Sequence, residues 1–249
     1  MIGVEIAAKY AYPPNRKGYC GKSAFASVLR RYLAGGTDAV GIENGLKKFH
    51  THHAYLSLIA RENSMDPFDT QVVRAFWTGN SLLENVSHGA LREFIARDLF
   101  QKSQKARAGR LSRNLPEGML PHHSLNALYI NFVTDRAARS LRNIDSCCVT
   151  WGRVLSIEGD SAVLRRSSIG WEDGFIIVPK TERIALSRAG VRFLGGVSRG
   201  DILSVHWGMA IERLRERDVC ALERYTKKNI KALGDTGFTP IGFERKVIE

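Results

Sequence analysis

The spacing of apolar residues changes near residue 145, and this change constrains the fold more than any other feature of the sequence. Before that point apolar residues recur at helical spacing, as on one face of residues 25–33. After it, short alternating runs are separated by turn residues, as in residues 149–157. We therefore predict an α+β chain. A mainly α-helical domain occupies residues 1–144, and a small β-barrel with a C-terminal helix occupies residues 145–249.

Local signals refine this outline. Asp69 and Ser87 are each placed to cap the N-terminus of a helix, because their side-chain oxygens can accept a bond from the first turn. Residues 211–233 are amphipathic and predict the terminal helix, with Cys220 in its apolar contact surface. Two prolines in Tyr10–Asn15 predict an extended turn, since proline lacks the amide hydrogen that a helix interior needs.

Composition excludes several classes of protein. The 249 residues are 44% hydrophobic, too apolar for a disordered chain, and they carry a net charge of +12. No apolar stretch approaches the roughly 20 residues that a membrane helix needs. The N-terminus has no basic segment before an uninterrupted apolar core, so a cytoplasmic location is expected. Four cysteines without a C-x-x-C pair predict neither a disulfide framework nor a zinc ribbon.

Two motifs of the second half carry most of the chemical information. The first starts at the cysteine of Cys147-Cys148-Val149-Thr150-Trp151-Gly152 and leads through an acidic-glycine turn to Ala162-Val163. The second is Gly200-Asp201-Ile202-Leu203-Ser204-Val205-His206-Trp207-Gly208-Met209-Ala210, which precedes the terminal helix. The first motif places a thiol beside a predicted strand, and the second places an imidazole in one. A thiolate is a soft donor and an imidazole a borderline one, and both suit a transition metal.

Together these motifs resemble the HypC/HybG/HupF family of [NiFe]-hydrogenase maturation chaperones over residues 146–233. The resemblance implies a HypC-like (OB-like) β-barrel in which Cys147 and His206 hold iron as an Fe(CN)2CO or Fe-CO fragment. It also implies contacts with a HypD-like maturation protein and with the hydrogenase large-subunit precursor. The chain departs from the family because Cys147 is internal, Cys148 has no counterpart, and Trp151 replaces a usual proline. In the family the cysteine stands at the processed N-terminus, beside a free amine. Because Cys147 is internal, a role of that amine cannot transfer to this chain.

The resemblance favours an accessory chaperone over an enzyme. The alternative is an enzyme of CO-ligand synthesis or iron-fragment processing, with Cys20 as its nucleophile or as a further soft ligand. Gly18 and Gly21 flank Cys20, Lys22 is nearby, and a predicted helix begins shortly afterwards. A cation and a helix N-terminus both lower the pKa of a thiol. An inert thiol in a packed aromatic turn explains the same sequence equally well.

Histidines concentrate in the first half and supply weaker metal candidates. His50 and His53 share a helix face, with Glu43 two turns earlier, although no constrained zinc motif surrounds them. His122 and His123 precede a predicted helix, so the pair could cap that helix or form one wall of a shared site.

Positive charge is uneven, with a net +9 on residues 1–144 and a net +3 on residues 145–249. The basic run in residues 102–113 suggests a third alternative, a nucleic-acid-binding protein. No aromatic residue stands beside that run to stack on bases, so nucleic acid is not the expected partner.

Overall fold

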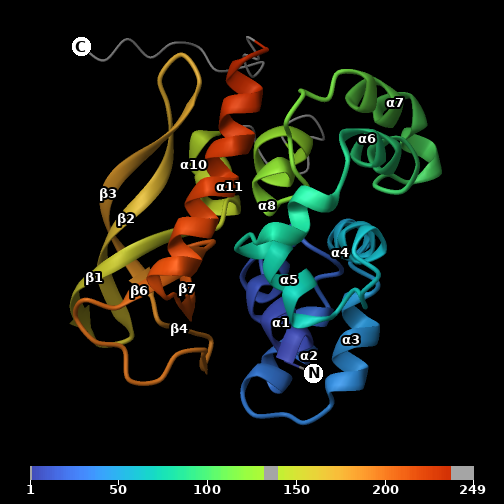
Figure 1. Ribbon diagram of the computed structural model, residues 1–249. Coiled ribbons are helices and arrows are strands. Elements are labelled where there is room, and N and C mark those ends of the chain that lie inside the picture. The colour runs from blue at the N-terminus through green and yellow to red at the C-terminus, as the bar shows by residue number, and fades with distance from the viewer. Residues whose placement is uncertain (1, 132–139, 237–249) are drawn as a thin grey trace.

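The computed structural model describes residues 2–131 and 140–236, and it consists of a helical region beside a β-barrel (Figure 1). This arrangement confirms the mixed α and β composition predicted from the change of periodicity. The helical region contains, in chain order, α1 (Ile2–Asn15), α2 (Phe25–Leu33), α3 (Ala39–Leu46), α4 (His50–Glu62), α5 (Thr70–Trp77), η1 (Ser81–Asn85), α6 (His88–Arg97), η2 (Lys102–Gln104), α7 (Lys105–Arg113), α8 (His123–Leu125) and the π-helical turn η3 (Asn126–Ile130).

The two predicted caps are confirmed. Asp69 accepts a hydrogen bond from the Gln71 amide at the start of α5, and Ser87 accepts one from the Ala90 amide at the start of α6. The apolar side chains of these helices are buried, because their spacing places them on one face toward the helical core.

The extended turn predicted for Tyr10–Asn15 is wrong, because these residues form the last turns of α1 with Pro13 and Pro14 inside the helix. The helix is buried along most of its length, and this packing offsets the two intrahelical bonds that the prolines remove. One carbonyl released in this way, that of Tyr10, finds a partner in the barrel, as described below. Tertiary contacts therefore override a local signal that would end a helix elsewhere.

The second region begins with α10 (Leu141–Cys147) and continues into a closed five-stranded barrel, in the order β1-β2-β3-β7-β6. Its strands are β1 (Thr150–Glu158), β2 (Ser161–Trp171), β3 (Phe175–Ala185), β6 (Ile202–His206) and β7 (Met209–Arg213). A separate two-stranded ribbon pairs β4 (Ser187–Arg188) with β5 (Val191–Arg192). The predicted tight turn after Glu158 is confirmed, because Glu158 pairs with Ser161 and Gly159 adopts a positive φ of 60°.

Two details of the C-terminal prediction are wrong. Residues 209–213 form strand β7 rather than the start of the helix, because Trp207 and Gly208 reverse the chain with φ angles of 51° and 72°. The helix α11 runs from Glu216 to Gly234 instead. Cys220 is exposed on that helix, whose buried face is formed by residues such as Leu222 and Tyr225.

The helical region and the barrel share one apolar core, which extends from α1 through the strands to α11. Within the interface the Tyr10 hydroxyl donates to Ser204 Oγ at 2.9 Å, and Arg74 forms an ion pair with Glu212 at 3.0 Å. Helix α11 packs on both α8 and β3, so it contacts both regions. Among the described helices, none has the length and apolar character to cross a bilayer.

Candidate metal centre

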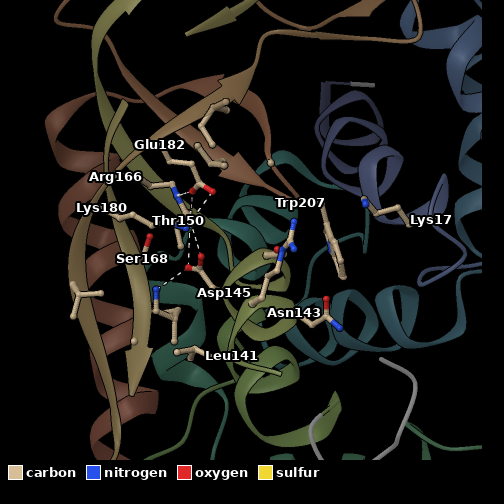
Figure 2. A pocket seen from close by; sticks show the side chains of 18 of the residues that line it. Lys17, Leu141, Asn143, Asp145, Thr150, Arg166, Ser168, Lys180, Glu182 and Trp207 are labelled. Carbon is tan, nitrogen blue, oxygen red and sulfur yellow. Dashed lines mark hydrogen bonds and ion pairs between the residues drawn. The ribbon is translucent and has the colours of Figure 1, made fainter. Parts of the chain in front are cut away.

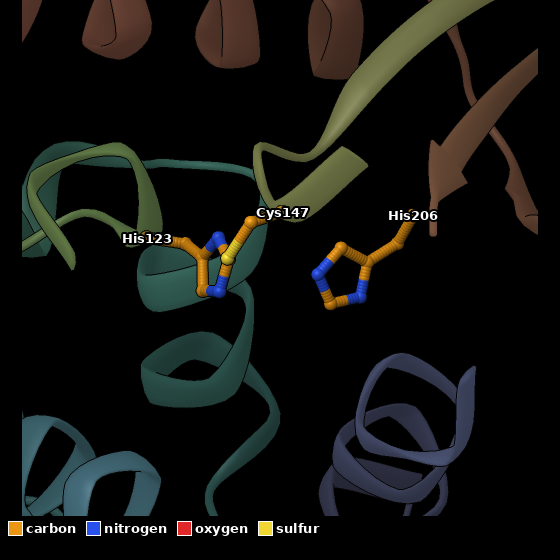
Figure 3. A group of neighbouring side chains, drawn as sticks. All are labelled: His123, Cys147 and His206. Atoms are coloured by element: carbon orange, nitrogen blue, oxygen red, sulfur yellow. The ribbon is translucent and has the colours of Figure 1, made fainter. Parts of the chain in front are cut away.

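His123, Cys147 and His206 converge at the interface between the helical region and the barrel (Figure 3). One potential ligand atom of each lies within 4.8 Å of the others, and this is the only such group of three in residues 2–131 and 140–236. His123 begins α8, Cys147 ends α10 and His206 ends β6. The structure thus brings together the two residues that the motifs single out, and it adds one of the weaker histidine candidates.

Cys147 presents its sulfur to the interior, although the residue as a whole is partly exposed. The Asn131 side-chain amide donates to Sγ at 3.5 Å. Burial, with a smaller contribution from nearby Cys20, raises the pKa of the thiol to about 12. The thiol therefore stays protonated at neutral pH until a cation or another positive group replaces its proton.

The helix that carries Cys147 is fixed to the barrel by a buried ion pair two residues earlier. Arg166 on β2 donates to both carboxylate oxygens of Asp145, at 3.1 and 2.5 Å, and also to Thr150 Oγ1 at 2.8 Å and to Glu182 at 2.7 Å. Asp145 also accepts the Ile169 amide at 2.7 Å. Because such a planar, two-bond contact is directional, it sets the position of the last turn of α10 and hence of the thiol.

His206 is oriented by the helix α1. Its Nδ1 lies 2.9 Å from the Tyr10 carbonyl oxygen, which Pro14 leaves without its usual helical donor. Since a carbonyl only accepts, Nδ1 carries the proton and Nε2 retains its lone pair. Nε2 is buried and forms no hydrogen bond of normal geometry with the described residues, and the Cys147 carbonyl is a second backbone neighbour of the ring. Burial lowers the pKa of the ring to about 4, so the imidazole is neutral.

His123 lies on an aromatic surface. Its ring stacks on Trp77 at 4.5 Å between centroids and meets the edge of Phe76 at 5.2 Å. The His206 ring approaches at 5.2 Å, nearly perpendicular. Burial and the neighbouring imidazoles hold the pKa of His123 well below its usual value. Two neutral imidazoles and one thiol therefore share a region from which water is largely excluded.

The other predicted candidates have different surroundings. His122 caps α8 because its Nδ1 accepts a hydrogen bond from the Ser124 amide at 3.3 Å, and His123 belongs to the centre, so the pair supplies both the cap and the wall that the sequence left open. His50 is exposed at the start of α4, and His53 stacks on Phe68. Neither joins the group of three. Cys20 is partly buried near Cys147, but α2 begins only at Phe25, five residues later.

Sequence reasoning missed His52. Both of its ring nitrogens are buried without a partner in the described part of the chain, and burial lowers its pKa to about 3. The ring lies 5.4 Å from that of Trp77, which also contacts His123. The helical periodicity indicates that His52 is buried, because His52 shares a helix face with Tyr55 and Ile59, both of which are fully buried.

The donor set restricts the chemistry of the centre. One thiolate and two imidazoles bind zinc, copper or ferrous iron, whereas calcium and magnesium require oxygen ligands. The orphaned Nε2 of His206 and Nδ1 of His123 fit this assignment, because buried ring nitrogens normally have a partner. A fixed tautomer held by a backbone carbonyl is also typical of histidines that bind metals.

A family model matches residues 1–237, which include the helical region, all three donors and the barrel. The chain belongs to the DUF6390 family. That family is described as one of unknown function. Comparison with curated proteins and with solved structures finds no match. Because the match crosses residue 145, the family is defined by the helical region and the barrel together.

Proposed function

We propose that this protein is a [NiFe]-hydrogenase maturation factor that holds an iron fragment at His123, Cys147 and His206. In this proposal it acts as a HypC-like chaperone, and the fragment, Fe(CN)2CO or its precursor, is cargo. The partners are a HypD-like maturation protein and the hydrogenase large-subunit precursor. The observation that carries the proposal is the convergence of Cys147 and His206, the two residues that match the chaperone motifs.

The roles of the other motif positions support the proposal. Gly152 lies against β2, where a Cβ atom would come within 2.9 Å of the Arg166 Cα, so only glycine allows the close strand pairing. Gly208 completes the tight turn after His206 with a φ of 72°, and Ala210 is buried inside the barrel. Gly152 and Gly208 therefore allow the strand pairing and the turn next to the cysteine and the histidine, and Ala210 packs in the barrel.

The donor set is suited to temporary binding. Both imidazoles are neutral and need lose no proton, so only the Cys147 thiol is deprotonated when a cation binds. A thiolate and imidazoles match low-spin ferrous iron with strong-field ligands. Three protein ligands leave further positions on iron for the diatomic groups, and return of a proton to Cys147 would favour release.

The test is anaerobic co-expression with the hydrogenase maturation proteins, followed by purification, elemental analysis and infrared spectroscopy. We expect iron, together with cyanide and carbonyl stretching bands. The Cys147→Ala variant should lose both, because it removes the only thiolate of the centre. Cys220→Ala is the matched control, since Cys220 is exposed on α11, and it should retain them.

Two results would reject the carrier role. One is wild-type protein that lacks the bands although the maturation proteins are active in the same cells. The other is a set of bands unchanged by Cys147→Ala.

A second candidate is an enzyme that makes or processes a ligand such as CO. It is favoured by the proximity of Cys20 to Cys147, which is close enough to contribute to the raised pKa of that thiol. The Cys20→Ser variant separates the two functions. A chaperone keeps its iron and its partners in this variant, whereas an enzyme keeps binding but loses turnover.

Nucleic-acid binding has less support. The basic run lies mainly on α7, whose sequence contains no aromatic residue. This reading predicts salt-sensitive retention on nucleic acid that Cys147→Ala does not change.

A further inference from the structure

A cavity of about 840 Å³ is lined by residues of α10 and by residues at the end of β6, the elements that carry Cys147 and His206 (Figure 2). It is bounded by α10, the inner part of the β2–β3 hairpin and the turn after β6. Its volume is in the range of sites that bind small molecules. None of the three donor residues lines it.

The cavity and the metal centre share a wall made of three pairs of consecutive residues. Tyr19, Ser146 and Trp207 line the cavity, and their chain neighbours Cys20, Cys147 and His206 lie at or beside the centre. The Trp207 amide donates to the Ser146 carbonyl at 2.9 Å, which ties two of the pairs together. Two of the three segments in this wall are therefore joined directly through their backbones.

The aromatic part of that wall is held rigidly. The backbone of Trp207 adopts the left-handed helical conformation, with a φ of 51°, which is uncommon for a residue with a bulky side chain. Its ring stacks on Tyr19 at 4.5 Å, and the Lys17 ammonium lies 5.8 Å from its centroid. Strained positions of this kind persist where the surroundings hold them, and they cluster at binding sites.

The charge in the cavity is positive. Five cationic side chains and two carboxylates line it, which leaves three positive charges uncompensated. Asp145 and Glu182 both contact Arg166. Lys17, Arg142 and Arg188 have no carboxylate at ion-pair distance within the described residues. These three cations lie on three separate segments and face one space, so they can bind a single anion together.

The walls also contain donors that are not used. Ser168 Oγ and Trp207 Nε1 are buried and lack partners among the described residues. Arg166, whose side chain is 5% exposed, lines the same space. Buried polar groups without a partner call for a water, an ion or a ligand. All of these groups can donate a hydrogen bond, which fits an acceptor-rich ligand.

We propose that this cavity is a binding site for a small multivalent anion that carries phosphate or carboxylate groups. The ligand contacts Lys17, Arg142 and Arg188, while Arg166 remains paired with its carboxylates. A small molecule is favoured over an acidic protein segment because the cationic groups line one cavity rather than a stripe across the surface. The proposal does not depend on the function proposed for the metal centre, since no donor of that centre is involved.

The test is isothermal titration calorimetry of the full chain with two probes, pyrophosphate and citrate, at low and at physiological salt. We expect saturable binding of at least one probe to the metal-free protein, with affinity that falls as salt is added. Preference for pyrophosphate or for citrate then identifies the phosphate or the carboxylate as the preferred group. The Cys147→Ala variant should bind equally well, so this result and the iron experiment can fail separately.

Variants locate the site. Arg188→Gln and Arg142→Gln should each weaken binding about tenfold, the effect of losing one charge-assisted hydrogen bond. Arg142 is exposed, so its replacement tests the site without disturbing the core. Arg165→Gln is the matched control, because Arg165 is an exposed neighbour of Arg166 on β2 that does not line the cavity.

Three outcomes would overturn the proposal. The first is absence of binding by both probes at millimolar concentration. The second is an equal loss in Arg165→Gln and in the two cavity variants, which would indicate a general effect of charge. The third is binding of an acidic peptide, such as a glutamate-rich one, in the absence of binding by either small anion.

Discussion

The candidate metal centre and the cavity lie on two sides of a shared wall, and they differ in the charge of the side chains that line them. On the side of Cys147 and His206, the ionisable groups are buried among aromatic rings, and burial keeps both the thiol and the imidazoles in their neutral forms. On the side of Ser146 and Trp207, the cavity is lined by lysine and arginine side chains that stay charged at all physiological pH values. Residues adjacent in sequence thus face opposite environments.

This difference indicates opposite ligands. The neutral side offers lone pairs and one removable proton, so it favours a cation. The charged side offers permanent donors, so it favours an anion. Because the two sides share no lining residue, the comparison can be tested by perturbing each side alone.

The largest expected effect is a loss of stability in mild acid from the neutral side. His52, His122 and His206 have pKa values of about 3, 3 and 4 in the folded protein, and His123 is also well below its ordinary 6.5. The unfolded chain therefore binds more protons once the pH falls below 6.5, so the free energy of unfolding decreases. Between pH 6.5 and pH 5, each of these histidines lowers the free energy of unfolding by up to about 2 kcal/mol. The four together lower it by several kcal/mol.

Urea denaturation of metal-free protein between pH 7 and 5 measures this effect. The charged side should not contribute in that range, because the lowered pKa of Glu182 causes loss of stability only below about 4.5. His52→Leu should reduce the dependence on pH, because it removes one of the buried neutral imidazoles. A flat profile from pH 7 to 5 would show that the histidines are not neutral by burial.

The next effect concerns the ion pair that anchors α10. Asp145→Asn removes the buried partner of Arg166 and should lower the free energy of unfolding by about 3–5 kcal/mol. Glu182→Gln should cost less, about 1 kcal/mol, because Glu182 is one-third exposed and water can replace it. Thermal and urea denaturation compare the two variants directly. Equal losses would mean that Asp145 does not have a special anchoring role.

The smallest effect tests the orientation of His206. Pro14→Ala supplies an amide hydrogen that competes with His206 Nδ1 for the Tyr10 carbonyl. Since such supporting contacts contribute about 10- to 100-fold to metal affinity, we expect cobalt(II) to bind at least tenfold more weakly. The absorption band of the thiolate–cobalt bond reports the binding.

Pro13→Ala is the matched control, because its new amide would face the Lys9 carbonyl instead. It should bind cobalt(II) as the wild type does. Equal weakening in both variants would point to a general disturbance of α1.

Much of the outline followed from local patterns. The change of period near residue 145, the caps at Asp69 and Ser87 and the glycine turn after Glu158 are properties of short segments, so the sequence contains them directly. The proximity of Cys147 and His206 came from a resemblance, because no local rule relates residues so far apart.

The remaining features depend on tertiary contacts. The helical state of Pro13 and Pro14 depends on the burial of α1, and β7 depends on a turn in which tryptophan takes a conformation that usually belongs to asparagine or glycine. His123 reaches the centre, and His52 lies near it, only because α8 and α4 pack around Trp77. The cavity has no linear signature, because it combines residues from separate segments of the chain.

The hydrogen bond from His206 to the Tyr10 carbonyl joins positions 196 residues apart. Residue 206 must therefore be synthesised before the imidazole acquires its orientation, so a shorter nascent chain cannot present the complete set of donors. Contacts this distant in sequence also form slowly. A cation that binds all three donors must accordingly arrive after His206 has left the ribosome.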